Sequence, residues 1–555
     1  MHKLELILKS GATLLFCMLL QACATTPQSR EMNALAKDVF EPVEQEEKLY
    51  PVILSVGFNG GMNFPYLLVE SLSEKTMIRK NNKTYKINVI NTDVARSTLI
   101  YSGKLPAGEY RIVELNTFVP SANPMLVGKT KFIKLDYQNK ANYIGTFNVV
   151  ENTTTDLGRM FLTHANDAYI FSRSENYPSN KELITKFGDK YLQAIYKDKV
   201  LPGWTQPITA IEKHFGNVNK LLPFGMQCFK ETQDNRVVAA SKIGAIFSFS
   251  LDNDIKDKNE KAKIPQSKNG LAFDCLTTKQ NSSFDFLAYG EMNNVYKHQK
   301  GSDGLIPVDT GNLPIGIIAY IVGNDQQGWY LAHIVGANLT IYRSDRLEKG
   351  DWKPLLTKKI FDAWLGLNGF WMWEDEHGFD YADIYGNINR YDYATKQWSQ
   401  HKVPDNANIT QLFVNPDQSF SLITSKGGFA GVFAKQFNSK DHGATWQKIE
   451  SPFKVNIWPA QVSTQGDMYI ASGPFSWGEL AVKEQGSSIW EKRKIIPQSY
   501  ITVLGSGTIL NSYFSPNFAV VDASKDKGKT WISVYSTFNS KLQELEKKPG
   551  VAVKK

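Results

Sequence analysis

Carboxylates and aromatic rings are concentrated between residues 364 and 385, and together they could bind a sugar or a peptide. Paired carboxylates occur in Glu374-Asp375-Glu376-His377 and at Asp380 and Asp383, and they could serve as the acid and base of a glycosidase or as a calcium loop. Aromatic faces beside such carboxylates suit a sugar ring. The alternatives are a solvated hairpin, since Gly378 signals a turn, and aromatic side chains that alternate into a packed core. The candidate ligand-binding residues are Trp371, Trp373, Asp375 and Tyr381.

Other patterns that carry chemistry are missing from the sequence. The histidines are scattered, with no H-E-x-x-H motif and no cluster of cysteine and histidine. Gly505-Ser506-Gly507 lacks the flanking residues of a nucleophile elbow, and no glycine-rich phosphate loop is present. We therefore expect no catalytic residue, no metal site and no cofactor.

The N-terminus has the features of a signal peptide. Lys3 and Lys9 are followed by an apolar run at residues 14–20. That run is too short to span a bilayer, which takes about 20 apolar residues, but it has the length of a signal-peptide core. We expect residues 1–22 to be removed as a signal peptide.

The apolar run ends in Leu20-Gln21-Ala22-Cys23, which resembles the lipobox of bacterial lipoproteins. The resemblance implies a diacylglycerol on the Cys23 thiol and an acylated amine, and several acyl chains would anchor the chain permanently. Ala24, in place of Asp, implies sorting to the outer membrane. An ordinary signal peptide with a chance cysteine is the alternative. Residues 23–47 are mostly polar and read as a flexible tether.

From Tyr50 onward the sequence changes to short β-strand patterns. Residues 83–90 largely alternate between polar and apolar side chains, as a half-buried strand does. The arrangement of residues 105–110 and 143–149 is similar to small prealbumin-like β-sandwich domains. The expected units are a β-sandwich at residues 48–152 and a connecting segment with short helices at residues 153–217.

Two stretches near the C-terminus, residues 439–446 and 524–531, share the pattern S-x-D-x-G-x-T-W. The Asp carboxylate can accept backbone N–H bonds across a tight turn, and the Gly permits a positive φ. The Thr can bond back to the turn, and the Trp can bury its ring between sheets. The expected structural residues are Ser439, Asp441, Gly443, Thr445 and Trp446 in the first stretch and Ser524, Asp526, Gly528, Thr530 and Trp531 in the second.

Both stretches resemble the Asp-box, or sialidase-type, repeat of β-propellers. Degenerate copies end at Trp352, Trp398 and Trp490, so that tryptophans recur at about the 40–50 residues of a four-stranded blade. The resemblance implies an all-β chain whose C-terminal β-propeller covers residues 218–540 in about seven four-stranded blades, with six or eight also possible. A polar tail follows at residues 541–555.

Cys228 and Cys275 lie about one blade length apart, at apparently equivalent positions of adjacent blades. An even pair of cysteines in an oxidising compartment can form a disulfide. The alternative is two buried thiols that act as small apolar side chains.

Sialidase activity is not expected. Members of that family have an Arg-Ile-Pro motif and a clamp of three arginines, whereas the nearest stretch here is Lys263-Ile264-Pro265. Lysine cannot reproduce the bidentate geometry of arginine. The arginines of the propeller region are Arg236, Arg343, Arg346, Arg390 and Arg493.

The sequence therefore predicts a non-catalytic binding or assembly lipoprotein of the outer membrane. The membrane, through the lipid on Cys23, and an envelope protein or polysaccharide are the expected partners. The net charge of +8 is small for 555 residues and the lysines are scattered, which argues against a nucleic-acid partner. The resemblance extends to Asp-box propellers used for binding, such as sortilin-type receptors and photosystem-assembly propellers. A carbohydrate-active hydrolase or lyase with a non-sialidase site is the alternative.

Overall fold

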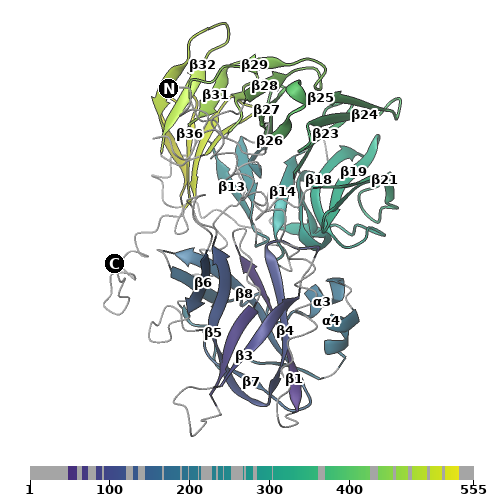
Figure 1. Ribbon diagram of the computed structural model, residues 1–555, viewed down its shortest axis with the longest axis vertical. Coiled ribbons are helices and arrows are strands. Elements are labelled where there is room, and N and C mark those ends of the chain that lie inside the picture. The colour runs from purple at the N-terminus through teal and green to yellow at the C-terminus, as the bar shows by residue number, and fades with distance from the viewer. Residues whose placement is uncertain are drawn as a thin grey trace, which may run out of the picture.

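The computed structural model of the chain divides into an N-terminal sheet domain and a C-terminal ring of sheets (Figure 1). It describes residues 48–536 apart from 59–65, 73–82, 91–92, 120–128, 135–143, 166–167, 188–189, 198, 211, 214–227, 233–234, 242, 252–266, 268–269, 279–283, 300, 303, 361–368, 426–434, 454–457, 473–477, 497–499 and 515–518. The predicted signal peptide, tether and C-terminal tail, with Cys23, lie outside the described residues. Within the described ranges no helix has both the length and the hydropathy needed to cross a membrane.

The N-terminal domain is one hydrogen-bonded sheet of ten strands, in the order β10-β8-β1-β4-β3-β2-β5-β6, with β7 beside β5 and β9 beside β8. The strands are β1 (Leu49–Phe58), β2 (Tyr66–Ser71), β3 (Thr84–Ile90), β4 (Thr98–Pro106), β5 (Gly108–Val119), β6 (Lys129–Lys134), β7 (Phe147–Val149), β8 (Thr154–Ala165), β9 (Ala168–Arg173) and β10 (Val200–Pro202). β1 pairs with β4 antiparallel and with β8 parallel.

The sheet bends at β3, because the first part of this strand pairs with β2 and the last part pairs with β4. Strands that change partners in this way turn the corners of folded sheets. The bend brings alternate apolar residues of β1, such as Val52 and Leu54, into one core with Leu67 of β2, Ile112 of β5 and Met160 of β8.

This domain is larger than the sequence predicted. The segment at residues 153–217 was expected only to connect the two domains, but it supplies β8, β9 and β10 to the sheet. It also contains the helices α3 (Lys181–Phe187) and α4 (Lys190–Ile195). The sheet therefore continues past residue 152 to Pro202.

Seven sheets follow, and they form the blades of a β-propeller, which confirms the predicted fold and blade number. Each blade consists of consecutive antiparallel strands. Blade 1 contains β11 (Lys230–Glu231), β12 (Arg236–Ala240) and β13 (Ile246–Ser250); blade 2 contains β14 (Phe273–Thr278), β15 (Phe284–Gly290), β16 (Val295–Gln299) and β17 (Leu305–Pro307); and blade 3 contains β18 (Ile317–Asn324), β19 (Gly328–Val335), β20 (Asn338–Ser344) and β21 (Lys353–Lys359).

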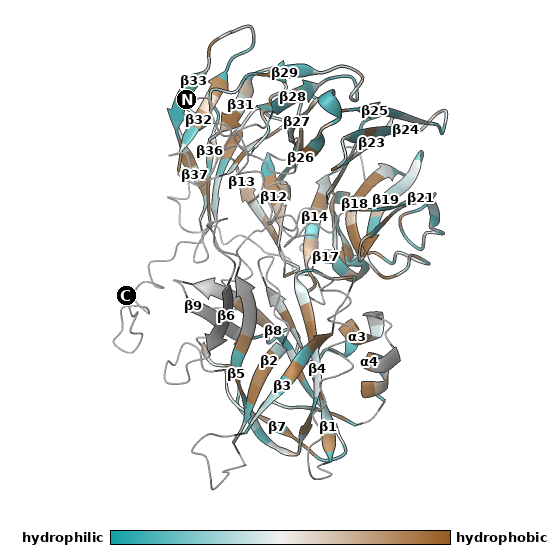
Figure 2. Ribbon diagram, in the orientation of Figure 1, coloured by the Kyte–Doolittle hydropathy of each residue, from teal (hydrophilic) through white to brown (hydrophobic). Residues whose placement is uncertain are grey.

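The other four blades follow in the same way. Blade 4 contains β22 (Phe370–Glu374), β23 (Gly378–Asp383), β24 (Asn387–Asp392) and β25 (Trp398–Lys402), and blade 5 contains β26 (Asn408–Val414), β27 (Phe420–Ser425), β28 (Lys435–Ser439) and β29 (Gln447–Ile449). Blade 6 contains β30 (Gln461–Val462), β31 (Met468–Ala471), β32 (Glu479–Lys483) and β33 (Glu491–Lys494), and blade 7 contains β34 (Tyr500–Val503), β35 (Ile509–Phe514), β36 (Ala519–Ser524) and β37 (Ile532–Ser536). Outer strands such as β25, β29 and β33 are mainly hydrophilic (Figure 2).

The five regularly spaced tryptophans occupy one position in five blades. Trp398 is the first residue of the outermost strand of its blade, and the other four immediately precede that strand: Trp352, Trp446, Trp490 and Trp531. The ring of Trp446 lies 5.4 Å from that of Phe420, edge to face, and contacts the core between blades 4 and 5. The tryptophan spacing therefore reports the repeat of the blades.

Among the described strands, none is exchanged between blades 1 and 7, and the contacts that join these two blades there are made by side chains. Phe247 and Phe249 of blade 1 lie 5.8 Å and 5.6 Å from the ring of Tyr535 in blade 7. The backbone N–H of Ser506 donates to Glu231 across the same junction, at 2.9 Å. Apolar burial and one charged hydrogen bond therefore join the two ends of the ring.

The inner strands of neighbouring blades are tied together by amide side chains. Gln461 of blade 6 accepts a bond from the backbone N–H of Val503 in blade 7, at 2.8 Å. Asn415 of blade 5 accepts one from the N–H of Val462 in blade 6, at 3.0 Å. These bonds satisfy backbone groups of inner strands that have a sheet neighbour on one side only.

The sheet domain packs on the propeller at blades 2 and 3. Ile53 and Ile100 of the sheet share an apolar cluster with Leu271 and Met292 of the propeller. Glu291, next to Met292, accepts backbone N–H bonds from Arg96, at 2.5 Å, and from Ser97. The buried guanidinium of Arg159 donates to the carbonyl of Gly270 at 2.8 Å. These contacts fix the two domains against each other.

Candidate functional site

The two S-x-D-x-G-x-T-W stretches form turns between the third and fourth strands of blades 5 and 7, with matching hydrogen bonds. In the first turn the Ser439 hydroxyl donates to Asp441 at 2.9 Å and accepts the N–H of Gly443 at 2.8 Å. The N–H and hydroxyl of Thr445 both donate to Asp441, at 2.8 Å and 2.5 Å. The second turn repeats this pattern.

In that second turn the Ser524 hydroxyl donates to Asp526 at 2.8 Å and accepts the N–H of Gly528 at 2.7 Å. Thr530 donates to Asp526 through its N–H and hydroxyl, at 2.8 Å and 2.7 Å. These bonds hold the pKa of Asp526 at about 2, although burial acts to raise it. The serine, aspartate and threonine shared by the two stretches therefore build the turn through hydrogen bonds with one another and with its backbone.

The residue before each glycine differs between the turns, and its side chain reaches the preceding blade. His442 has a φ of 57° and Lys527 a φ of 60°, so both adopt the left-handed region. His442 contacts carboxylates of blade 4, and Lys527 contacts carboxylates of blade 6. We call the first group, Asp375, Asp380, Arg390 and His442, the blade 4–5 cluster, and the second group, Asp467, Glu484 and Lys527, the blade 6–7 cluster.

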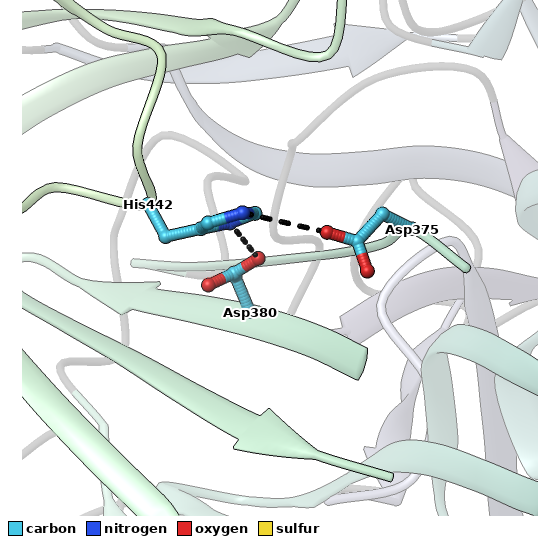
Figure 3. A group of neighbouring side chains, drawn as sticks. All are labelled: Asp375, Asp380 and His442. Carbon is cyan, nitrogen blue, oxygen red and sulfur yellow. Dashed lines mark hydrogen bonds and ion pairs between the residues drawn. The ribbon is translucent and has the colours of Figure 1, made fainter. Parts of the chain in front are cut away.

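In the blade 4–5 cluster, two carboxylates of blade 4 face the imidazole of His442 (Figure 3). Asp375 lies in the β22–β23 turn and Asp380 in β23. The Nδ1 atom of His442 is 3.0 Å from Asp380, and its Nε2 atom is 3.5 Å from Asp375. Arg390 of β24 places one guanidinium nitrogen 2.8 Å from Asp380 and another 2.9 Å from Asp375.

The charges of this cluster support one another. The hydrogen bond to Asp380 raises the pKa of His442 above its ordinary value of 6.5, against the effects of burial and of the Arg390 charge. Burial would raise the pKa of Asp375, but hydrogen bonds from Arg390 and from the N–H of His377 lower it. With His442 protonated, two carboxylates face two cations and the net charge is zero.

The donor atoms of Asp375, Asp380 and His442 lie within 4.8 Å of one another, close enough to be considered as ligands of one metal ion. A guanidinium nitrogen of Arg390, however, is 2.8 Å from Asp380 and 2.9 Å from His442 Nδ1. Arg390 thus supplies the positive charge among these atoms, and the residues do not fit a metal ion. Asp380 is fully buried and out of reach of a substrate. The arrangement holds two blades together.

The blade 6–7 cluster makes the corresponding junction with a permanent cation. The Lys527 ammonium is 3.0 Å from Asp467 and 3.2 Å from Glu484. Asp467 is buried, precedes β31 and also accepts the N–H of Gln485 at 2.9 Å. The hydrogen bond that Lys527 donates to Asp467 raises the pKa of Lys527, so this junction keeps its charge at any physiological pH.

The prediction of an aromatic binding face has to be corrected. Trp371, Trp373 and Tyr381 are 6%, 7% and 4% exposed, and they belong to the cores on either side of blade 4. Alternate residues of β22 and β23 point to neighbouring blades, so these rings cannot stack on an external sugar. Of the candidate ligand-binding residues, only Asp375 lies in the cluster of Figure 3.

Of the other predicted site residues, Cys228, Cys275 and those of the two turns have structural roles, and Cys23 lies outside the described residues. Cys228 and Cys275 form a disulfide between blades 1 and 2, with Cα atoms 5.2 Å apart. Sequence reasoning did not identify Arg390 and His442 as partners. A signal was available, because His442 and Lys527 are the cationic residues that precede the glycine of each turn.

Comparisons with known proteins concern the fold. No family model matches the sequence, and no curated protein does. Among solved structures, the chain is similar to dihydro-heme d1 dehydrogenase NirN in complex with DHE, at 11% identity and a TM-score of 0.34 over 57% of this chain and 66% of that one. It is similar to the WD40 β-propeller domain of Doa1, at 10% identity and a TM-score of 0.34 over 54% and 93% of the two chains. For YCF48 bound to D1 peptide, identity is 13%, the TM-score 0.36 and coverage 55% and 93%.

Proposed function

We propose that this chain is a lipid-anchored lipoprotein of the outer membrane and that its β-propeller acts as a non-catalytic binding or assembly module. The lipid would sit on Cys23, within the lipobox-like Leu20–Cys23 stretch. The partner would be an envelope protein or polysaccharide. The two S-x-D-x-G-x-T-W turns resemble the Asp-box, a repeat that propellers use to build blades.

One observation carries the non-catalytic part of the proposal. One cluster of two carboxylates and an imidazole, Asp375, Asp380 and His442, is engaged with Arg390 between two blades. A general acid or base must reach the proton that it transfers, and the buried Asp380 cannot. The sheet domain docks on the propeller through a shared apolar cluster, and surfaces held in place before binding favour affinity.

The anchor is tested by labelling cells with an alkyne analogue of palmitate. The wild type and a Cys17→Ser variant, which changes the other cysteine of the N-terminal region, are expected to take up label and to sediment with outer membranes. A Cys23→Ser variant is expected to lose the label and the membrane association. Labelling of Cys23→Ser to the wild-type level would contradict the anchor.

Binding is tested by incubating the detergent-solubilised protein with an array of envelope polysaccharides and, separately, by cross-linking it in whole cells. We expect a saturable complex with one polysaccharide or one envelope protein. Incubation with the same polysaccharides is expected to leave their length unchanged. Release of shorter products, proportional to the amount of protein, would favour the hydrolase or lyase alternative and contradict the proposal.

A further inference from the structure

The Nδ1 atom of His442 lies between two partners that require opposite protonation states. It is 3.0 Å from a carboxylate oxygen of Asp380 and 2.9 Å from a guanidinium nitrogen of Arg390. A protonated Nδ1 can donate to Asp380 but cannot accept from Arg390. An unprotonated Nδ1 can accept from Arg390 but offers nothing to Asp380. A single geometry therefore serves two hydrogen-bond patterns.

We propose that the blade 4–5 cluster is a pH-responsive contact, in which protonated His442 binds blade 5 tightly to blade 4 and neutral His442 weakens that junction. In the protonated form the imidazolium neutralises the second of two carboxylates, since Arg390 neutralises only one. In the neutral form a net negative charge remains at a half-buried site, where burial disfavours it.

No other charged group of the described residues near His442 offsets this change. On blade 4, Glu376 and His377 stand exposed at the tip of the hairpin and pair with each other. On its own turn, Asp441 is engaged by Ser439 and Thr445, and Lys440 is exposed. The charges that act on the imidazole are therefore those of Asp375, Asp380 and Arg390.

The sign of the effect follows from the direction of the pKa shift. Folding raises the pKa of His442 above its ordinary value of 6.5, so its contribution to the junction is complete below that value. The contribution is lost as the pH rises through the pKa of the folded protein. The blade 6–7 cluster, with Lys527 in the corresponding place, has no such dependence in this range and serves as an internal control.

Hydrogen exchange of the full-length protein in detergent, measured by mass spectrometry between pH 5 and 9 and corrected for intrinsic exchange rates, tests the proposal. Peptides that cover residues 375–390 and 439–446 are expected to lose severalfold of their protection as the pH rises, because neutral His442 leaves a net negative charge at this junction. Peptides that cover residues 524–531 are expected to keep theirs.

Three variants make the test decisive. His442→Asn, which stays neutral, is expected to show the weaker protection at every pH, and Lys527→His is expected to make the blade 6–7 junction pH-dependent. His442→Lys is expected to remove the pH dependence of the blade 4–5 junction while it keeps the cation. Wild-type pH dependence that persists in His442→Asn, or its absence from the wild type, would overturn the proposal.

Discussion

The turns of blades 5 and 7 share six of eight residues and the same serine and threonine hydrogen bonds, yet they join their blades by different chemistry. Each serine, aspartate and threonine makes matching bonds, within a few tenths of an ångström. The residue before the glycine is His442 in one turn and Lys527 in the other. Each contacts one buried and one more exposed carboxylate of the preceding blade, and the pair at His442 is also bound by Arg390. The repeated residues therefore determine the backbone of the turn, while the variable residue before the glycine determines the chemistry between blades.

The largest difference between the two junctions should appear when their buried carboxylates are removed. Asp380→Asn leaves Arg390 and His442 with Asp375 as their one remaining shared carboxylate, and breaking a buried pair costs about 3–5 kcal/mol. Asp467→Asn weakens the contact with the Lys527 ammonium, which water can partly solvate, and the hydrogen bond from the N–H of Gln485. The loss of free energy of unfolding should be about 1–3 kcal/mol. Guanidinium denaturation of the two variants measures both losses. Equal losses would show that the junctions are energetically alike.

The turns themselves should respond alike. Asp441→Ala and Asp526→Ala each remove three bonds to the serine and threonine of the turn, and each should cost about 1–2 kcal/mol in the free energy of unfolding. Since folding lowers both aspartate pKa values, the two contributions are present above the ordinary value of 3.8 and are lost in acid, for Asp526 as the pH falls through about 2. Denaturation curves at pH 7 and pH 2 check this. A clear difference between the two variants at pH 7 would mean that the contact with the preceding blade changes the stability of the turn.

The smallest effect concerns salt. The pair between Lys527 and Glu484 is partly exposed, and such pairs contribute about 0–1 kcal/mol and are screened by salt. Glu484→Gln should therefore lower the melting temperature slightly in dilute buffer and leave it unchanged in about 1 M NaCl, where the screening length is roughly 3 Å. The matched change on blade 4, Asp375→Asn, should retain its effect in salt because Arg390 is mostly buried. Equal salt sensitivity would remove this distinction between the clusters.

The sequence predicted the elements that are local and missed those that depend on packing between distant segments. The tryptophan spacing predicted the blades because each blade is one continuous stretch of chain. β8 was missed because it pairs in parallel with β1, about 100 residues earlier, and such pairing leaves no local pattern. Trp371 and Trp373 were ambiguous, since alternate aromatics on a strand have the same pattern in a core and on a binding face.

For the same reason, only part of the candidate site could be predicted from the sequence. The bonds within each turn follow from residues that are two to four positions apart, so the motif indicated them. Arg390 and His442 are 52 residues apart and meet only because blade 5 packs on blade 4. No periodic pattern in the sequence indicates the contact between Arg390 and His442.

The side-chain closure between blades 1 and 7 has a consequence for biosynthesis. Phe247 and Phe249 find their partner Tyr535 only after nearly the whole propeller has been synthesised. At about 5–20 residues per second, the first blade waits on the order of 15–60 s with an apolar face uncovered. During that interval nascent chains are most vulnerable to joining one another instead of closing, and any truncation before the last strand makes that exposure permanent.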